Sequence, residues 1–151
     1  MLFLLFQLGD NRYALAAREV VVVLPLVNVV WLPGLPAAIA GVCNYRGSHV
    51  PVVDLCQVLL GRPAVRRLHT RIVVVNYRAE DGGARPLGLI AERATETLQR
   101  EAGDFAPSGV SGEHLGSVVA DAKGLTQRVE VNGLLPAPVR ELLFRNAVQP
   151  P

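Results

Sequence analysis

The chain has 151 residues, of which 50% are apolar and 19% are charged. That is enough apolar material for the core of one ordinary domain, and it argues against disorder. Fifteen basic residues nearly balance thirteen acidic ones, and the net charge of +2 excludes the strongly basic surface of a nucleic-acid-binding protein.

The first 32 residues are short apolar runs separated by turn residues, a pattern typical of strands. The expected strands are Leu2–Leu8, Tyr13–Ala16, Val20–Leu24 and Val27–Leu32. The first is almost wholly apolar, which predicts a strand covered on both faces. No charge occurs between Val20 and Tyr45, but three prolines in that run would each cost about 3 kcal/mol in a membrane-spanning helix. We therefore expect a soluble, cytoplasmic protein with no direct membrane insertion.

Residues 33–61 combine turn signals with a strand hairpin. Pro33-Gly34 predicts a turn, and Pro36 predicts the start of a short helix, Pro36–Ala40, which Gly41 would end. Turn residues Gly47-Ser48 separate two expected strands, Val42–Arg46 and Ser48–Val53. Pro51 cannot donate to a sheet ladder, which places the second strand at an edge or a bulge. Asp54 is a candidate N-cap for a helix over Leu55–Leu60, with Gly61 as its stop.

The second half repeats the strand pattern after a connecting loop, Gly61–Thr70. The expected elements are strands Arg71–Tyr77, Pro86–Ala91, Glu92–Leu98, Leu115–Asp121 and Leu125–Val131, and an amphipathic helix Pro138–Arg145 with Val139, Leu142 and Leu143 on one side. Two series of short strands with little helix predict a mainly β fold of two small barrels.

No pattern in the chain indicates catalysis, a cofactor or a metal. Cys43, His49 and Cys56 have a spacing that matches no common zinc site, and the two cysteines are expected to be buried free thiols. There is no G-x-S-x-G turn and no glycine-rich phosphate loop at the start of a helix.

Several motifs together are similar to those of the CheW-like adaptor domain of bacterial chemotaxis. They are Phe3 to Gly9 followed by Tyr13-Ala14-Leu15, Pro33-Gly34-Leu35-Pro36, Gly41-Val42, Asn44-Tyr45-Arg46-Gly47 with Pro51 and Asp54-Leu55, and Gly88-Leu89-Ile90. The resemblance implies one CheW-like domain over residues 1–151, with halves near 1–62 and 70–145 that exchange strands. Its fold would be two intertwined five-stranded SH3-like barrels with a hydrophobic groove between them.

The resemblance also implies a function that is not enzymatic. Such an adaptor, recruited from the cytoplasm to membrane receptor arrays, binds the regulatory domain of a CheA-type histidine kinase and the cytoplasmic tip of a methyl-accepting chemoreceptor. The receptor tip is a helical hairpin, which would lie in the groove.

The receptor-binding positions that the resemblance implies are Val20, Val22, Arg46, Ile72, Gly88, Ala94 and Thr97. Arg46 is the only charged residue in a long uncharged stretch, and arginine is common at interface hot spots; the alternative is an ion pair with Asp54. Many members have glutamate where Val22 stands, so one polar receptor contact is expected to be missing. The alternative for Ile72 is an ordinary core residue.

The kinase-binding positions that we expect are Trp31, Gly41 and Val42. Aromatic residues dominate interface hot spots, which favours an exposed Trp31; the alternative is that Trp31 fills the barrel core. A different class of function also stays open, a small-molecule-binding or enzymatic β-barrel that uses the groove. Converging carboxylates or histidines in the groove would favour that class, whereas a long apolar trough would favour a bound helix.

Overall fold

The computed structural model describes residues 1–26, 29–79, 82–107, 109 and 117–144. Its strands are β1 (Leu2–Leu8), β2 (Asn11–Ala16), β3 (Val20–Pro25), β4 (Val29–Trp31), β5 (Ile39–Tyr45), β6 (Ser48–Asp54), β7 (Arg71–Arg78), β8 (Ala84–Ala91), β9 (Glu96–Gln99), β10 (Ala106–Pro107), β11 (Ser117–Asp121) and β12 (Gly124–Val129). Its helices are α1 (Leu55–Leu60), α2 (Val131–Leu134) and α3 (Ala137–Leu142), with short 3-10 turns η1 (Ala17–Glu19) and η2 (Ala102–Asp104). No helix among these residues is long and apolar enough to span a membrane.

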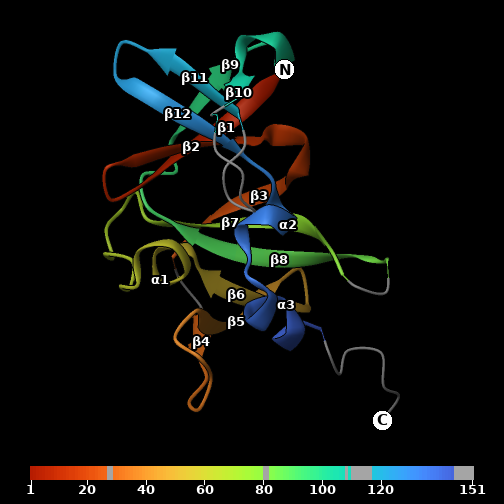
Figure 1. The fold of residues 1–151 in the computed structure, drawn as a ribbon. Coiled ribbons are helices and arrows are strands. Elements are labelled where there is room, and N and C mark those ends of the chain that lie inside the picture. Colours follow the sequence, from red (N-terminus) through yellow and green to blue (C-terminus); the bar gives the residue numbers. More distant parts are fainter. Residues whose placement is uncertain (27–28, 80–81, 108, 110–116, 145–151) are drawn as a thin grey trace.

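The strands form two curled sheets, one above the other in Figure 1. The first sheet has the order β10-β11-β12-β2-β1-β9 and the second has the order β3-β7-β8-β6-β5-β4. Strands β1 and β2 pair with strands from the second half of the chain, while β7 and β8 lie between β3 and β6. The two halves are therefore intertwined, as the resemblance implies. Each sheet has six strands rather than the five expected.

The core lies between the sheets and inside the curl of each one. Along β7, Val73, Val75 and Tyr77 face the shared core, whereas Ile72 and Val74 face the interior of the second sheet. Strand β1 divides its side chains between the shared core and the interior of the first sheet. This alternation confirms that β1 is covered on both faces.

The hairpin and the helix that follows it form as predicted. Strands β5 and β6 pair from Tyr45↔Ser48 to Ile39↔Val53. The Asp54 side chain accepts a hydrogen bond from the Cys56 amide at 2.9 Å and caps α1. Gly61 ends α1 in the left-handed conformation with a φ of 70°, which glycine adopts without a steric cost.

The predicted helix Pro36–Ala40 is wrong. The Ile39 amide donates to the Pro36 carbonyl at 2.9 Å, which closes one turn, and the chain then enters β5. Gly41 therefore lies within a strand, between Trp31 of β4 and Val52 of β6. Long-range pairing outweighs the local helix signal here.

Of the two places expected for the strand with Pro51, the sheet edge is wrong, because β6 lies between β5 and β8. The pairing of β6 with β5 does contain a register shift, between Ile39 and Gly41. The parallel pairs of β6 with β8 begin only at Val52↔Gly88. Pro51 precedes them, so the strand has no paired neighbour on the β8 side at that level.

Three other predicted boundaries need correction. Glu92 and Arg93 form a turn, and β9 begins only at Glu96. Val131 starts α2 instead of ending a strand. In the C-terminal helix the predicted apolar face is only partly buried, because Val139 is buried but Leu142 is exposed. The predicted starts at Val27 and Leu115 lie outside the described residues. The predicted extension of the last helix to Arg145 is wrong, because α3 ends at Leu142 and the next two residues form a turn.

Candidate functional site

Arg46 lies at the tip of the β5–β6 hairpin, with a positive φ of 52°. The Asn44 side-chain oxygen accepts a hydrogen bond from the Gly47 amide at 3.0 Å and so holds the turn. The guanidinium carbon of Arg46 lies 5.3 Å from the centre of the Tyr45 ring. Arg46 is exposed, which leaves one face of a flat cation available to a partner.

The Asp54 carboxylate is hydrogen-bonded to backbone amides and not to Arg46. Its carboxylate accepts hydrogen bonds from the amides of Cys56 and Ala64, at 2.9 and 3.0 Å, and the residue is buried. Burial raises the pKa of Asp54 in spite of these bonds. The alternative interpretation of Arg46, an ion pair with Asp54, is therefore wrong.

The three predicted kinase-binding residues meet at the free edge of the second sheet. Trp31 of β4 pairs with Gly41 of β5, and Val30 pairs with Val42. Trp31 is 46% exposed and outside the core, so the alternative that it fills a barrel core is wrong. The guanidinium carbon of Arg66 lies 4.2 Å from the centre of the Trp31 ring, in a cation–π contact.

This edge is notably apolar for a surface. Its exposed large apolar side chains are Val30, Trp31, Leu32 and Leu35. An edge strand also offers unpaired backbone groups, and contiguous apolar side chains on a surface mark interaction sites.

The predicted receptor-binding residues fall into three separate places. Val20 and Val22 are half-buried on β3, and Ile72 and Gly88 are buried beside each other on β7 and β8. Arg46 lies at the hairpin tip. The remaining two are Ala94, which is buried, and Thr97, which is exposed on β9 of the first sheet. Ile72 packs in the core cluster inside the second sheet, as its alternative interpretation stated.

Strand pairing connects two of these predicted sets. One row of paired residues crosses all six strands of the second sheet: Trp31, Gly41, Val52, Gly88, Val74 and Val22. The expected kinase-binding edge and two expected receptor-binding positions thus lie at the same level of one sheet.

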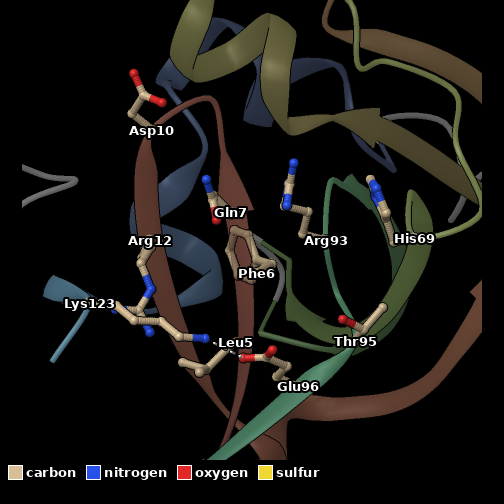
Figure 2. Close-up of a pocket in the computed structure, with 10 residues that line it drawn as sticks. All are labelled: Leu5, Phe6, Gln7, Asp10, Arg12, His69, Arg93, Thr95, Glu96 and Lys123. Carbon is tan, nitrogen blue, oxygen red and sulfur yellow. Dashed lines mark ion pairs between the residues drawn. The ribbon is translucent and has the colours of Figure 1, made fainter. Parts of the chain in front are cut away.

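The structure adds a polar cleft that the sequence did not reveal. The cleft, of about 370 Å³, lies beside β1 and β9 (Figure 2). Its lining residues are Leu5, Phe6, Gln7, Asp10, Arg12, His69, Arg93, Thr95, Glu96 and Lys123. A second cleft, of about 210 Å³, shares Asp10, His69 and Arg93 with it and adds Arg62, Arg67 and Glu92 among others. These residues come from distant segments, and no local motif joins them.

Partly buried hydrogen bonds hold the walls of these clefts. Arg12 donates to both carboxylate oxygens of Asp121, at 2.9 and 3.1 Å, and this pairing lowers the pKa of Asp121 to about 2. Burial acts to raise the pKa of Glu92, but hydrogen bonds from Arg62 and the Val65 amide outweigh it, and the pKa is lowered. The loop between α1 and β7 is thereby tied to the turn after β8.

Comparisons with known proteins agree with the fold. Residues 2–137 match the family model of the CheW-like domain. The chain is 26% identical to the chemotaxis protein CheW of Klebsiella aerogenes, over 70% of this chain and 61% of that protein. It is 27% identical to the protein FrzA of Myxococcus xanthus, over 91% of this chain and 64% of that protein. The match thus spans less than two thirds of either relative.

A solved structure, the scaffolding protein TtCheW from Thermoanaerobacter tengcongensis, superimposes with a TM-score of 0.78. The two chains share 20% identity, with 94% of this chain and 92% of that chain covered, so this likeness supports the fold. The resemblance drawn from the motifs is confirmed, and the chain belongs to the family of CheW-like domains.

Proposed function

We propose that this chain is a non-enzymatic adaptor that couples the cytoplasmic tip of a chemoreceptor to a CheA-type histidine kinase. The observation that carries the proposal is the match to the CheW-like domain over residues 2–137. The protein would act in the cytoplasm, recruited to receptor arrays at the membrane. By binding both partners at once, it would let the state of the receptor bias the activity of the kinase.

The free edge of the second sheet is the proposed kinase-binding surface. Trp31 is half-exposed over Gly41, and Val42 lies in the neighbouring strand. The cation–π contact with Arg66 favours one orientation of the indole, which would reduce the entropy lost when a partner covers it. An aromatic anchor beside apolar side chains is the composition of an interface hot spot.

Arg46 at the hairpin tip and, separately, Val20 and Val22 on β3 are proposed receptor-binding positions. Arg46 presents a charge at a hairpin tip whose turn is held by Asn44. Ile72, Gly88 and Ala94 are buried, so we propose that they act on receptor binding through the packing beneath β3 and the turn after β8. Thr97 is exposed and would touch the receptor directly.

A pull-down against a kinase regulatory domain and a receptor tip tests both surfaces. We expect Arg46→Glu to weaken receptor binding and leave kinase binding intact, and Trp31→Ala to do the opposite. Arg66→Ala is a matched variant for Trp31, because it removes the stacking cation without touching the indole. Loss of both partners in either variant, or of neither, contradicts the proposal, provided that circular dichroism shows the variant to be folded.

A further inference from the structure

We propose that the cleft at Arg93 and His69 binds the carboxylate side chains of an acidic segment on a partner protein. This site is separate from the surfaces proposed above, because neither Arg46 nor Trp31 lines either cleft. The inference therefore does not depend on the proposed adaptor function.

The first argument is the balance of charge. Three ion pairs neutralise much of the lining: Arg12–Asp121, Arg62–Glu92 and Lys123–Glu96. Arg93 lines both clefts and Arg67 lines the smaller one, and within the described part of the chain no carboxylate forms an ion pair with either arginine. Among the described lining residues, Asp10 is the one carboxylate without an ion pair. The surplus is cationic, and two guanidinium groups suit the planar carboxylate.

The second argument is an unsatisfied polar atom. The His69 Nδ1 atom is shut off from solvent and has no hydrogen-bond partner among the described residues. Buried nitrogen atoms almost always have a partner, so this atom would reach a ligand group once the imidazole of His69, which is itself only half-buried, turns toward the cleft. Figure 2 shows the nitrogen-bearing ends of Arg93 and His69 on the same side of the cleft.

The third argument is that backbone hydrogen bonds fix the turn that carries Arg93 and the loop that carries His69. The Ala94 amide donates to the His69 carbonyl at 3.2 Å, and the Gln7 amide donates to the Glu92 carbonyl at 3.0 Å. Arg93 sits in the turn between these two bonds with a positive φ of 50°, which only a constrained backbone imposes on arginine. A site built in this way loses little entropy when it binds.

The shape of the cleft favours a protein segment over a free small molecule. Leu5 and Phe6 are buried, whereas Asp10, Arg93 and Thr95 are all exposed. A ligand here would stay open to solvent on one side, as the side chains of a docked segment do, whereas small-molecule sites usually bury most of their ligand.

The test is a calorimetric titration of the whole protein with a capped hexaglutamate peptide at low salt. We expect saturable binding that weakens about tenfold in Arg93→Gly, the loss of one charge-assisted contact. Arg18→Ala is the control, since Arg18 is also an exposed arginine and lines neither cleft. Glycine tolerates the φ of 50° at position 93, so Arg93→Gly does not strain the backbone.

Three results would overturn the proposal. They are the absence of saturable binding, an equal loss in the Arg18→Ala variant, and amide chemical-shift changes that miss His69, Arg93 and Thr95. Free glutarate provides the remaining comparison, because binding as tight as that of the peptide would assign the cleft to a small carboxylate and reject the acidic segment. Each outcome is independent of the kinase and receptor pull-down, so failure of one proposal is distinguishable from failure of the other.

Discussion

Trp31 and Gly41 face each other across β4 and β5 so closely that a Cβ atom at position 41 would lie 3.1 Å from the Trp31 Cα. The same atom would lie 2.8 Å from the carbonyl carbon of Val30. Gly41 also has a φ of +153°, which side-chain-bearing residues rarely adopt. The path of the β4 edge strand therefore requires glycine at position 41.

We expect Gly41→Ala to push β4 away from β5 and to lower the free energy of unfolding by roughly 1–3 kcal/mol, the usual cost of overpacking. Urea denaturation measures the loss. Trp31 is the only tryptophan in the chain, so its fluorescence reports directly on β4. Gly103→Ala is the control, because nothing lies within 4 Å of a Cβ at that position. Unchanged emission and stability in Gly41→Ala would contradict this account of the edge.

Gly88 and Ile72 provide a test of packing inside the second sheet. A Cβ at position 88 would lie 2.9 Å from Ile72 Cγ2, so Gly88→Ala should cost roughly 1–3 kcal/mol. Ile72→Ala removes that methyl group and should cost about 2–5 kcal/mol alone. In the double variant the new methyl group partly fills the space, so we expect the combined loss to be less than the sum by about 0.5–3 kcal/mol.

A double-mutant cycle from urea titrations measures this coupling. Receptor binding by the four proteins then tests how these buried residues act. If binding falls only as the folded fraction falls, both residues serve the core. A folded Gly88→Ala variant that binds no receptor would instead support the proposed effect on the binding surface.

The ion pair between Arg12 and Asp121 should make stability fall at acid pH. The folded state lowers the pKa of Asp121 from 3.8 to about 2, chiefly through the hydrogen bond from Arg12. The stabilisation is fully present above the ordinary pKa and is lost as the pH falls toward about 2. We expect Asp121→Asn to be less stable than the original chain at neutral pH and to differ from it progressively less through this window. Urea midpoints across the window measure the difference, and a constant gap would contradict the linkage.

Cys43 and Cys56 should resist thiol reagents in the folded protein. Both are buried and free, and burial raises the pKa of each thiol, that of Cys56 to about 12. The thiolate is the reactive form, and at pH 8 a thiol with this pKa is ionised to only about one part in ten thousand. We expect labelling with a disulfide reagent to be negligible at pH 8 and complete after unfolding in urea. Fast labelling without denaturant would show that the cores around these cysteines open readily.

Local sequence signals predicted the elements whose stability is itself local. The N-cap at Asp54 and the left-handed stop at Gly61 each involve residues within one helix, and both were placed correctly. Runs of β-branched residues likewise predicted most strands of the second sheet, including β7 and β8. Ile39 is the counterexample, because its pairing partner Val53 lies far along the chain, and that pairing overrides the helix signal from Pro36.

The expected site residues also divide into those that local sequence predicts and those that depend on long-range strand pairing. The motif around Arg46 identified an exposed cation correctly, since turn residues bring such a side chain to a hairpin tip. Sequence reasoning left Trp31 undecided between core and surface, because the exposure of an apolar residue depends on which strand lies at the sheet edge. The cleft was missed because Phe6, His69, Arg93 and Lys123 come from four separate segments.

The sequence by itself determined the mainly β class, the turns and caps, and the membership of the CheW-like family, because each of these depends on residue types at short spacing. Only the tertiary structure decided which strands pair, which edge is exposed, and which charges neutralise one another. Those outcomes depend on contacts between residues far apart in the chain, such as Arg12 with Asp121, whose formation is governed by the packing of the whole domain. The exposed Trp31 edge and the cationic surplus at Arg93 are both products of that packing.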